Sequence, residues 1–221
     1  LKYIENNVSI SKIEICGHPE YDMVYSSYIK REEIKKRLCS DLNLDINLPL
    51  IIFAIPQFAE QGIMSWEKHW EIIFSYLEVI TKLKVNLFLS LHPRMNRIKY
   101  KQLEKKYKCF IIKGNLSDYI GSADIFIASN STVLSWSILC NIKTVVIYSP
   151  IRSLISHLNS IFYEPNPKKL NTLLKRILRT EVHSNKDDYK TLSRNEVFFG
   201  RSLDLHHKCL KEITEEFKNC S

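Results

Sequence analysis

Two short polar segments of this sequence carry side chains that could hold a phosphate group. The first is His92-Pro93-Arg94, which directly follows an apolar run of strand length. An imidazole can donate a hydrogen bond to a phosphate oxygen, and a guanidinium can bind a phosphate through two parallel hydrogen bonds. The proline fixes the direction in which the chain leaves the strand. Taken alone, the segment also fits an ordinary turn at a strand end, since polar loop residues are common.

The second segment is Ser129-Asn130-Ser131-Thr132, between an apolar run at 124–128 and a stretch with helical apolar spacing at 133–140. Residues of these types cap helices, and hydroxyl and backbone N–H groups at a helix N-terminus attract anions. An ordinary helix cap is the simpler interpretation of this segment alone. Both segments suit a phosphate and both follow strands. Their occurrence together favours phosphate binding more than either segment does alone.

Other polar residues are weaker candidates. Gln57 follows the apolar run 50–55 and could contact a base, a ribose or an acceptor, although a loop glutamine facing water is simpler. His69 is expected on the surface of a helix. His18 lies near Glu20 and Asp22, where an acid–base pair can be imagined, but a structural hinge is the simpler account.

These candidates depend on a regular alternation of apolar runs and helical segments. The expected strands are 9–15, 50–55, 84–90, 109–113, 124–128 and 144–148, and the expected helices are 31–44, 65–80, 98–107, 133–140, 165–179 and 205–219. A short helical turn is expected at 116–120, helical or irregular structure at 151–162, and a polar loop at 180–194. This order predicts an α/β fold with a Rossmann-like doubly wound parallel sheet. Ligands of such sheets bind at the carboxyl ends of the strands, where both polar segments are expected.

The sequence has too few glycines for a glycine-rich phosphate loop. It contains 5 glycines and neither a GxGxxG nor a GxxxxGK[ST] pattern. A phosphate would therefore be held at a helix start with hydroxyl and cationic side chains.

Composition narrows the choice of partners and compartment. The net charge of +8 over 221 residues favours anionic partners, but the cations are spread over several helices and no nucleic-acid pattern is evident, so no nucleic acid partner is expected. The 6 cysteines form no CxxC pair and read as reduced thiols of a cytoplasmic protein, and no metal site is expected. No apolar run reaches the ~20 residues of a membrane-spanning helix. The start at Leu1 suggests a piece of a longer chain.

Several motifs, in order, resemble a known family. They are the turn Gly17-His18-Pro19-Glu20-Tyr21-Asp22, the strand end Leu89-Ser90-Leu91-His92-Pro93, the stretch 116–124, the turn 129–132 and the strand Lys143 to Tyr148. Together they resemble the carboxyl-terminal halves of GT-B glycosyltransferases. The combination looks most like bacterial sialyltransferases and polysialyltransferases and CDP-glycerol glycerophosphotransferases, and the same scaffold occurs in UDP-N-acetylglucosamine 2-epimerases. The resemblance covers Ile15 to Leu178.

The resemblance implies a GT-B carboxyl-terminal domain with three parts. Residues 1–22 would form an interdomain hinge and first strand, 23–180 a Rossmann-like nucleotide-binding domain, and 181–221 a loop and a carboxyl-terminal helix that packs back on the fold. The acceptor-binding amino-terminal domain, which usually carries the catalytic base, would be missing from this chain.

The resemblance also implies an activity and its site. The protein would be a nucleotide-sugar-dependent glycosyltransferase, or a glycerophosphotransferase, of bacterial surface polysaccharide or capsule synthesis, without a cofactor. His92 would act in catalysis by neutralising the leaving group, and the nucleotide phosphate would be held by His92, Ser131 and Thr132. The full expected binding set is Gln57, His92, Pro93, Arg94, Ser129, Asn130, Ser131 and Thr132.

The implied partners are a CMP-, CDP- or UDP-linked sugar, a glycan acceptor and the missing domain. The implied location is the cytoplasm, with peripheral contact to the anionic inner face of the membrane. One departure concerns the ribose or sugar contact: Ser135 and Trp136 stand where many relatives carry an acidic residue. Two alternatives remain, a UDP-N-acetylglucosamine 2-epimerase or hydrolase and a non-catalytic module that binds at a membrane surface.

Overall fold

The protein forms alternating strands and helices. The structure, a computed structural model, describes residues 20–129, 131, 133–148, 161–180, 207 and 211. Its helices are α1 (Glu20–Ile29), α2 (Arg31–Asp41), α3 (Trp66–Ile80), α4 (Arg97–Lys106), α5 (Leu134–Leu139) and α6 (Pro167–Arg179). Its strands are β1 (Leu50–Ala54), β2 (Asn86–Ser90), β3 (Phe110–Ile111), β4 (Ile125–Ala128), β5 (Lys143–Val146) and β6 (Ile161–Tyr163). Short 3-10 turns at Leu116–Asp118 (η3) and Ile120–Ser122 (η4) precede β4.

The described strands form one parallel sheet. Its order is β3-β2-β1-β4-β5-β6, and every neighbouring pair is parallel. The order reverses between β1 and β4, and such a reversal is the place where open α/β sheets bind ligands. β1 is a continuous apolar run whose first four residues are fully buried, as parallel strands covered on both faces require.

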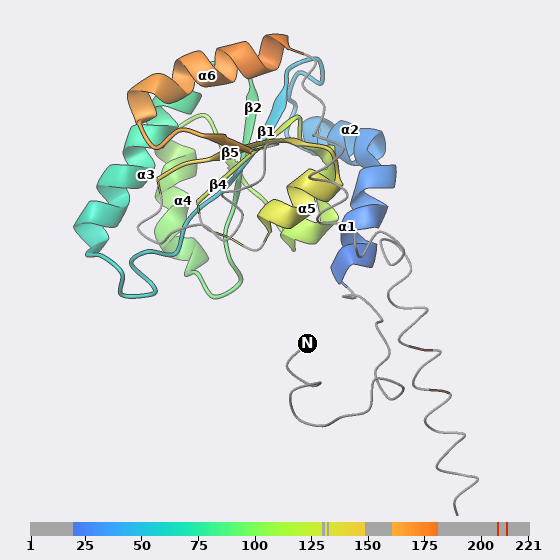
Figure 1. Ribbon diagram of the computed structural model, residues 1–221, viewed down its shortest axis with the longest axis horizontal. Helices are drawn as coiled ribbons and strands as arrows, with labels where there is room; N and C mark the ends of the chain where they lie inside the picture. Colours follow the sequence, from blue (N-terminus) through green and yellow to red (C-terminus); the bar gives the residue numbers. More distant parts are fainter. Residues whose placement is uncertain are drawn as a thin grey trace, which may run out of the picture.

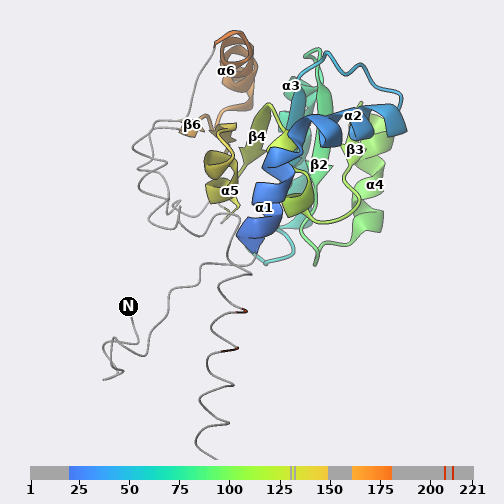
Figure 2. The ribbon, with the colours of Figure 1, turned by 90° about the vertical axis from the view of Figure 1, so that its right-hand side faces the viewer.

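Helices cover both faces of the sheet, as Figure 1 shows. Alternate residues of β1 face opposite layers: Ile51 and Phe53 pack with α3, α4 and α6, whereas Leu50 and Ile52 pack in the core beneath α1 and α5. The view in Figure 2 has α1 and α2 on the near face and α6 beside β6. The expected doubly wound, Rossmann-like α/β fold is therefore confirmed.

Two elements differ from the sequence prediction. Helix α1 was not predicted, and its first residues, Glu20 to Asp22, were expected to belong to a turn. The helix lacks an apolar stripe: Val24 and Ser27 are its buried residues, so periodicity gives no signal. Strand β6 falls partly where helical or irregular structure was expected, because it is a short strand at the sheet edge that is only partly buried. The expected strand 9–15 and most of the hinge lie outside the described residues, and the division into three parts stays a prediction.

A close approach between α1 and η4 explains Gly121. The Gly121 N–H donates to Ser27 Oγ (3.0 Å), and that hydroxyl donates to the Val24 carbonyl (2.8 Å). A Cβ at position 121 would overlap the backbone of Ser27 and Tyr28. The glycine is needed here for contact between two segments far apart in sequence.

Helix caps and cysteines follow the sequence prediction more closely. Ser65 caps α3 by accepting from the Lys68 N–H (3.3 Å). The described cysteines Cys39, Cys109 and Cys140 are free and buried, and burial raises the pKa of Cys109 and of Cys140 to about 12. Of the expected helix 205–219, only residues 207 and 211 are described, and both are helical.

Candidate functional site

The candidate residues leave the same edge of the sheet. The register pairs Ala54 with Ser90 and Phe53 with Ile127, so β1, β2 and β4 end side by side. The loop after β1 carries Gln57, the loop after β2 carries His92, and the segment after β4 begins with Ser129. Segments that lie far apart in the sequence thus leave the sheet at neighbouring strand ends, beside the reversal of strand order where α/β proteins bind ligands.

The turn after β2 presents His92 and Arg94 to solvent. Both side chains are exposed, and the turn is closed by a hydrogen bond from the Met95 N–H to the His92 carbonyl (2.9 Å). Met95 is buried beneath the turn and anchors it to the core. The His92 Nδ1 accepts from the Arg94 N–H (3.2 Å). Because Nδ1 is an acceptor, the ring proton lies on Nε2, and Nε2–H is the donor that the turn offers to a ligand.

The two described serines of the segment after β4 have different environments. Ser129 is buried, and its Oγ donates to the Tyr148 carbonyl (2.9 Å), which joins the ends of β4 and β5. Ser131 is half-buried, and its Oγ accepts from the Val133 N–H (3.4 Å). Helix α5 is short, beginning at Leu134 and ending at Leu139, so the site cannot depend on a strong helix dipole. Asn130 and Thr132 lie outside the described residues.

Tyr148 holds the end of β5 in place. Its N–H donates to Tyr76 Oη (3.0 Å), and that hydroxyl donates to the Pro165 carbonyl (2.7 Å). Burial raises the pKa of Tyr76 to about 12, which keeps its hydroxyl protonated. The Tyr148 ring meets the Phe58 ring edge-on at 6.3 Å between centroids. The edge of the sheet is thereby tied to α3 and to the loop after β1.

Gln57 opens a helical turn in the loop after β1. Its carbonyl accepts from the Gln61 N–H (2.9 Å), and its side-chain Oε1 accepts from Gln61 Nε2 (3.4 Å). The side chain is half-buried. Glu60 in the same turn accepts a hydrogen bond from Tyr100 Oη (2.6 Å). The amide group of Gln57 is thus held near the reversal point by a loop with its own anchor.

Comparison with known proteins identifies the family. The model of the alpha-2,8-polysialyltransferase family matches residues 20–151, more than half of the chain. The chain belongs to the alpha-2,8-polysialyltransferase family. The matched residues include Gln57, His92 and Ser131. The resemblance to bacterial sialyltransferases and polysialyltransferases is therefore confirmed. A search of curated proteins finds no match.

Solved structures similar to this polysialyltransferase-family chain support the fold. The wall teichoic acid polymerase TagF matches with a TM-score of 0.53 at 15% identity, over 95% of this chain and 54% of the polymerase. A structure of that polymerase with CDPG has a TM-score of 0.56 at 16% identity, over 96% of this chain and 53% of the other. The Methanocaldococcus jannaschii UDP-GlcNAc 2-epimerase, in complex with UDP-GlcNAc and UDP, has a TM-score of 0.54 at 14% identity, over 88% and 57%. This chain spans a little over half the length of these proteins.

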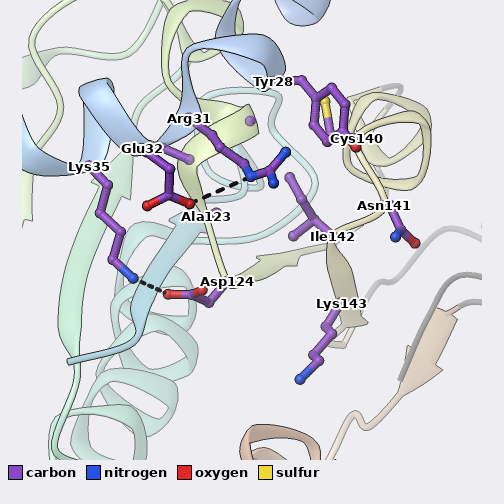
Figure 3. Close-up of a pocket in the computed structure, with 12 residues that line it drawn as sticks. Tyr28, Arg31, Glu32, Lys35, Ala123, Asp124, Cys140, Asn141, Ile142 and Lys143 are labelled. Carbon is purple, nitrogen blue, oxygen red and sulfur yellow. Dashed lines mark hydrogen bonds and ion pairs between the residues drawn. The ribbon is translucent and has the colours of Figure 1, made fainter. Parts of the chain in front are cut away.

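A cavity of about 440 Å³ in this family member lies at the opposite, amino-terminal edge of the sheet (Figure 3). Its charged groups are paired within the protein. Lys35 Nζ lies 2.9 Å from Asp124 Oδ2, which also accepts from the Leu50 N–H (2.7 Å). Lys143 Nζ donates to two carbonyl groups at the end of α6. The cavity is therefore a braced gap between α2 and the strand starts, and the carboxyl edge remains the candidate site.

One buried polar cluster of this polysialyltransferase-family chain was not predicted from the sequence. His69, expected on the surface of α3, is fully buried, and that expectation is wrong. Its Nε2 lies 2.8 Å from Tyr100 Oη, the hydroxyl that donates to Glu60. The neighbouring Trp66 and Trp70, at helical spacing, were the available sign that position 69 faces inward, since all three share one side of the helix.

Within the described ranges, no group of three or more His, Cys, Asp or Glu side chains could bind a metal ion. Among the helices that the structure describes, none is long and apolar enough to span a membrane.

Proposed function

We propose that this chain is the donor-nucleotide-binding part of a glycosyltransferase of bacterial surface polysaccharide synthesis. The convergence of the loops after β1, β2 and β4 at the reversal of strand order carries this proposal. Membership of the alpha-2,8-polysialyltransferase family gives the reaction class. The nucleotide phosphate would sit between the His92 turn and Ser131, with Pro93 shaping the turn and Asn130 and Thr132 as further contacts.

The chemistry of this site is stabilisation of a leaving group. The bond between the sugar carbon and the donor phosphate breaks, and its electron pair passes to the phosphate oxygen. The His92 Nε2–H and the Arg94 guanidinium offset that negative charge, and the Ser131 hydroxyl donates to the same phosphate. His92 is in this sense the catalytic residue. The acceptor hydroxyl forms the new bond and gives its proton to a base on the amino-terminal domain, as the resemblance implies.

The nucleotide is proposed from the relatives. The polymerase structure with CDPG and the epimerase structure with UDP share this fold. A thermal-shift panel of CMP, CDP, UDP, GDP and ADP on the full chain tests the proposal. We expect a pyrimidine nucleotide to raise Tm, and His92→Ala to abolish most of that rise. No shift with any nucleotide would refute the proposal. The glycan acceptor, the amino-terminal domain and a role in capsule synthesis are parts of the same proposal.

An epimerase or hydrolase acting on a UDP-sugar is the second candidate, and the similarity to the UDP-GlcNAc 2-epimerase favours it. Such an enzyme would need no acceptor. Incubating the full-length protein with UDP-N-acetylglucosamine alone separates the two candidates. An epimer or free sugar in the product would favour this second function, and an unchanged substrate would exclude it.

We also propose a cytoplasmic location at the anionic inner face of the membrane. Helix α4 and its flanks carry a dense run of cations, and Ile98 among them is 78% exposed. These cations are Arg94, Arg97, Lys99, Lys101, Lys105, Lys106 and Lys108. Cations beside an exposed apolar side chain suit a surface of acidic lipids. Co-sedimentation with phosphatidylserine vesicles, lost in Lys101→Glu/Lys105→Glu, tests the location. Equal sedimentation with neutral vesicles would refute this location. If no vesicle binds the protein, the alternative of a non-catalytic membrane-binding module is refuted as well.

A further inference from the structure

A buried hydrogen-bond chain runs beneath the loops at the nucleotide edge. Tyr100 Oη on α4 lies 2.6 Å from Glu60 Oε1 and 2.8 Å from His69 Nε2 on α3. Tyr100 and His69 are both fully buried. Figure 1 shows α3 and α4 on the same side of the sheet, and Glu60 belongs to the loop that leads from β1 into α3.

The direction of each hydrogen bond follows from the donors available. A phenol has one proton, and Tyr100 donates it to the carboxylate of Glu60. The Tyr100 oxygen then accepts from His69, so the proton of the His69 ring lies on Nε2. Burial and the Glu60 hydrogen bond raise the pKa of Tyr100, which keeps the phenol a donor. The three groups therefore form one directed chain from His69 through Tyr100 to Glu60.

These three hydrogen-bonded residues join the two loops that carry the proposed nucleotide contacts. Glu60 lies in the same helical turn as Gln57, and the Gln61 N–H closes that turn on the Gln57 carbonyl. Tyr100 lies one turn into α4, the helix that begins shortly after the His92 turn. The hydrogen bond between Tyr100 and Glu60 thus connects the loop after β1 directly to the element that follows the loop after β2.

A purely structural role explains the hydrogen-bonded group of Glu60, Tyr100 and His69 poorly. Burying a carboxylate and an imidazole is unfavourable when phenylalanine and leucine would fill the same space. Among the residues that the structure describes, Glu60 Oε2 and His69 Nδ1 are buried and find no hydrogen-bond partner. Natural proteins break the rule that buried polar groups are satisfied mainly at functional or strained sites.

We propose that Glu60, Tyr100 and His69 are positioning residues that hold Gln57 and the His92 turn in fixed relation at the nucleotide edge. None of the three contacts the nucleotide in this proposal. Its consequence for binding depends on the function proposed above, whereas its consequence for the loop does not. Removing the Tyr100 hydroxyl should release the loop after β1 while leaving the sheet intact.

Hydrogen exchange tests the loop directly in the full chain without a nucleotide. The amides of Gln61, Gly62 and Ile63 are bonded to carbonyl groups within the loop, so their exchange reports its opening. We expect Tyr100→Phe to speed exchange of peptide 57–64 about tenfold, as loss of a hydrogen bond to a charged group implies. Peptides from β4, β5 and α6 should exchange at the original rate.

Tyr107→Phe is the matched control. It removes a phenol from the C-cap residue of the same helix, and the partner of that phenol is Glu78 on α3 (3.5 Å) and not a loop at the nucleotide edge. Unchanged exchange of 57–64 in Tyr100→Phe would overturn the proposal. Equal acceleration in both variants, or acceleration spread over all peptides, would also overturn it, because the phenol would then only stabilise the fold.

Nucleotide binding provides the second readout. At a temperature where both variants are fully folded, calorimetry with CMP, CDP and UDP should show affinity about fivefold to tenfold weaker in Tyr100→Phe and unchanged in Tyr107→Phe. If no nucleotide binds the unmodified protein, the proposed function fails, and the exchange experiment still decides whether the loop is held. If the nucleotide binds equally to both variants, the positioning role is refuted and the proposed function stands.

Discussion

His92 offers the most direct test of the nucleotide site. Its side chain is exposed. The ring accepts from the Arg94 N–H through Nδ1, and the backbone of His92 makes the contacts that close the turn. Removing the ring should therefore leave global stability nearly unchanged, since exposed substitutions usually alter it by less than about 0.5 kcal/mol. The Nε2–H donor to a phosphate would be lost.

The expected loss of binding follows from the charge of the acceptor. A hydrogen bond to a charged group contributes about 1.5–3 kcal/mol. His92→Ala should therefore weaken the binding of the preferred pyrimidine nucleotide by roughly tenfold to a hundredfold. Isothermal titration calorimetry of the full chain at fixed ionic strength measures this change.

Two further variants control for effects of His92→Ala other than loss of the imidazole donor. An asparagine at position 92 can accept the Arg94 N–H through its side-chain oxygen, as in an Asx turn, so His92→Asn keeps the turn without the Nε2–H donor. His92→Ala and His92→Asn should lose nucleotide affinity to a similar extent. Lys168→Ala, an exposed cation on α6, controls for loss of net positive charge. Wild-type affinity in His92→Ala would refute the reasoning, and recovery in His92→Asn would show that the imidazole itself is not required, because the asparagine amide is also a donor.

Three further predictions concern the supporting structure. Ser129→Ala should lower the free energy of unfolding by about 1 kcal/mol, through loss of the hydrogen bond to Tyr148, without changing nucleotide affinity. Ser131→Ala should weaken nucleotide affinity without changing the free energy of unfolding. Calorimetry and urea unfolding measure the two quantities, and equal behaviour of the two variants would contradict this prediction. Gly121→Ala should destabilise the fold by more than about 3 kcal/mol, because its Cβ overlaps the backbone of α1, and a near-normal Tm would contradict that overlap. Burial lowers the pKa of His69 from its usual 6.5, so below pH 6.5 the unfolded state binds more protons than the folded state. The free energy of unfolding should therefore decrease as the pH is lowered, by at most about 1.4 kcal/mol per pH unit, until the folded pKa is passed. Nearby Glu60 opposes this shift and Lys99, over the Trp66 ring, faces the same cluster; urea unfolding between pH 5 and 7.5 should show a shallower slope in His69→Gln, and an identical slope would exclude His69.

The sequence was sufficient where neighbouring residues determine the structure. The apolar run of β1 and the Ser65 cap of α3 are local signals, and both were read correctly. The order of strands and helices then determined the fold, because parallel strands with helical connections have few possible arrangements. Helix α1 was missed because its stability comes from contact with η4 and not from its own pattern.

The site was predictable in outline and not in its internal contacts. Polar residues after strands predict that these segments leave one edge of the sheet, because the described strands all run in the same direction. The sequence does not distinguish Ser129, which binds Tyr148, from Ser131, which faces the helix start. Nor does it bring Glu60, His69 and Tyr100 together, since they meet only after two helices pack.

The two phosphate-suited turns share one device, which explains how a fold with few glycines could hold an anion. His92 Nδ1 accepts from the N–H two residues later, and Ser131 Oγ does the same. In each case a backbone N–H occupies an acceptor position of the side chain, so the hydrogen that the side chain carries is the group left for a ligand. Both turns therefore offer donors to the space above the sheet, and Arg94 adds a guanidinium, which has donors only. A site made of donors disfavours cations and binds anionic acceptors more strongly than neutral ones, without a glycine-rich loop. A phosphate, rich in acceptor oxygens, is the ligand that such an arrangement suits best.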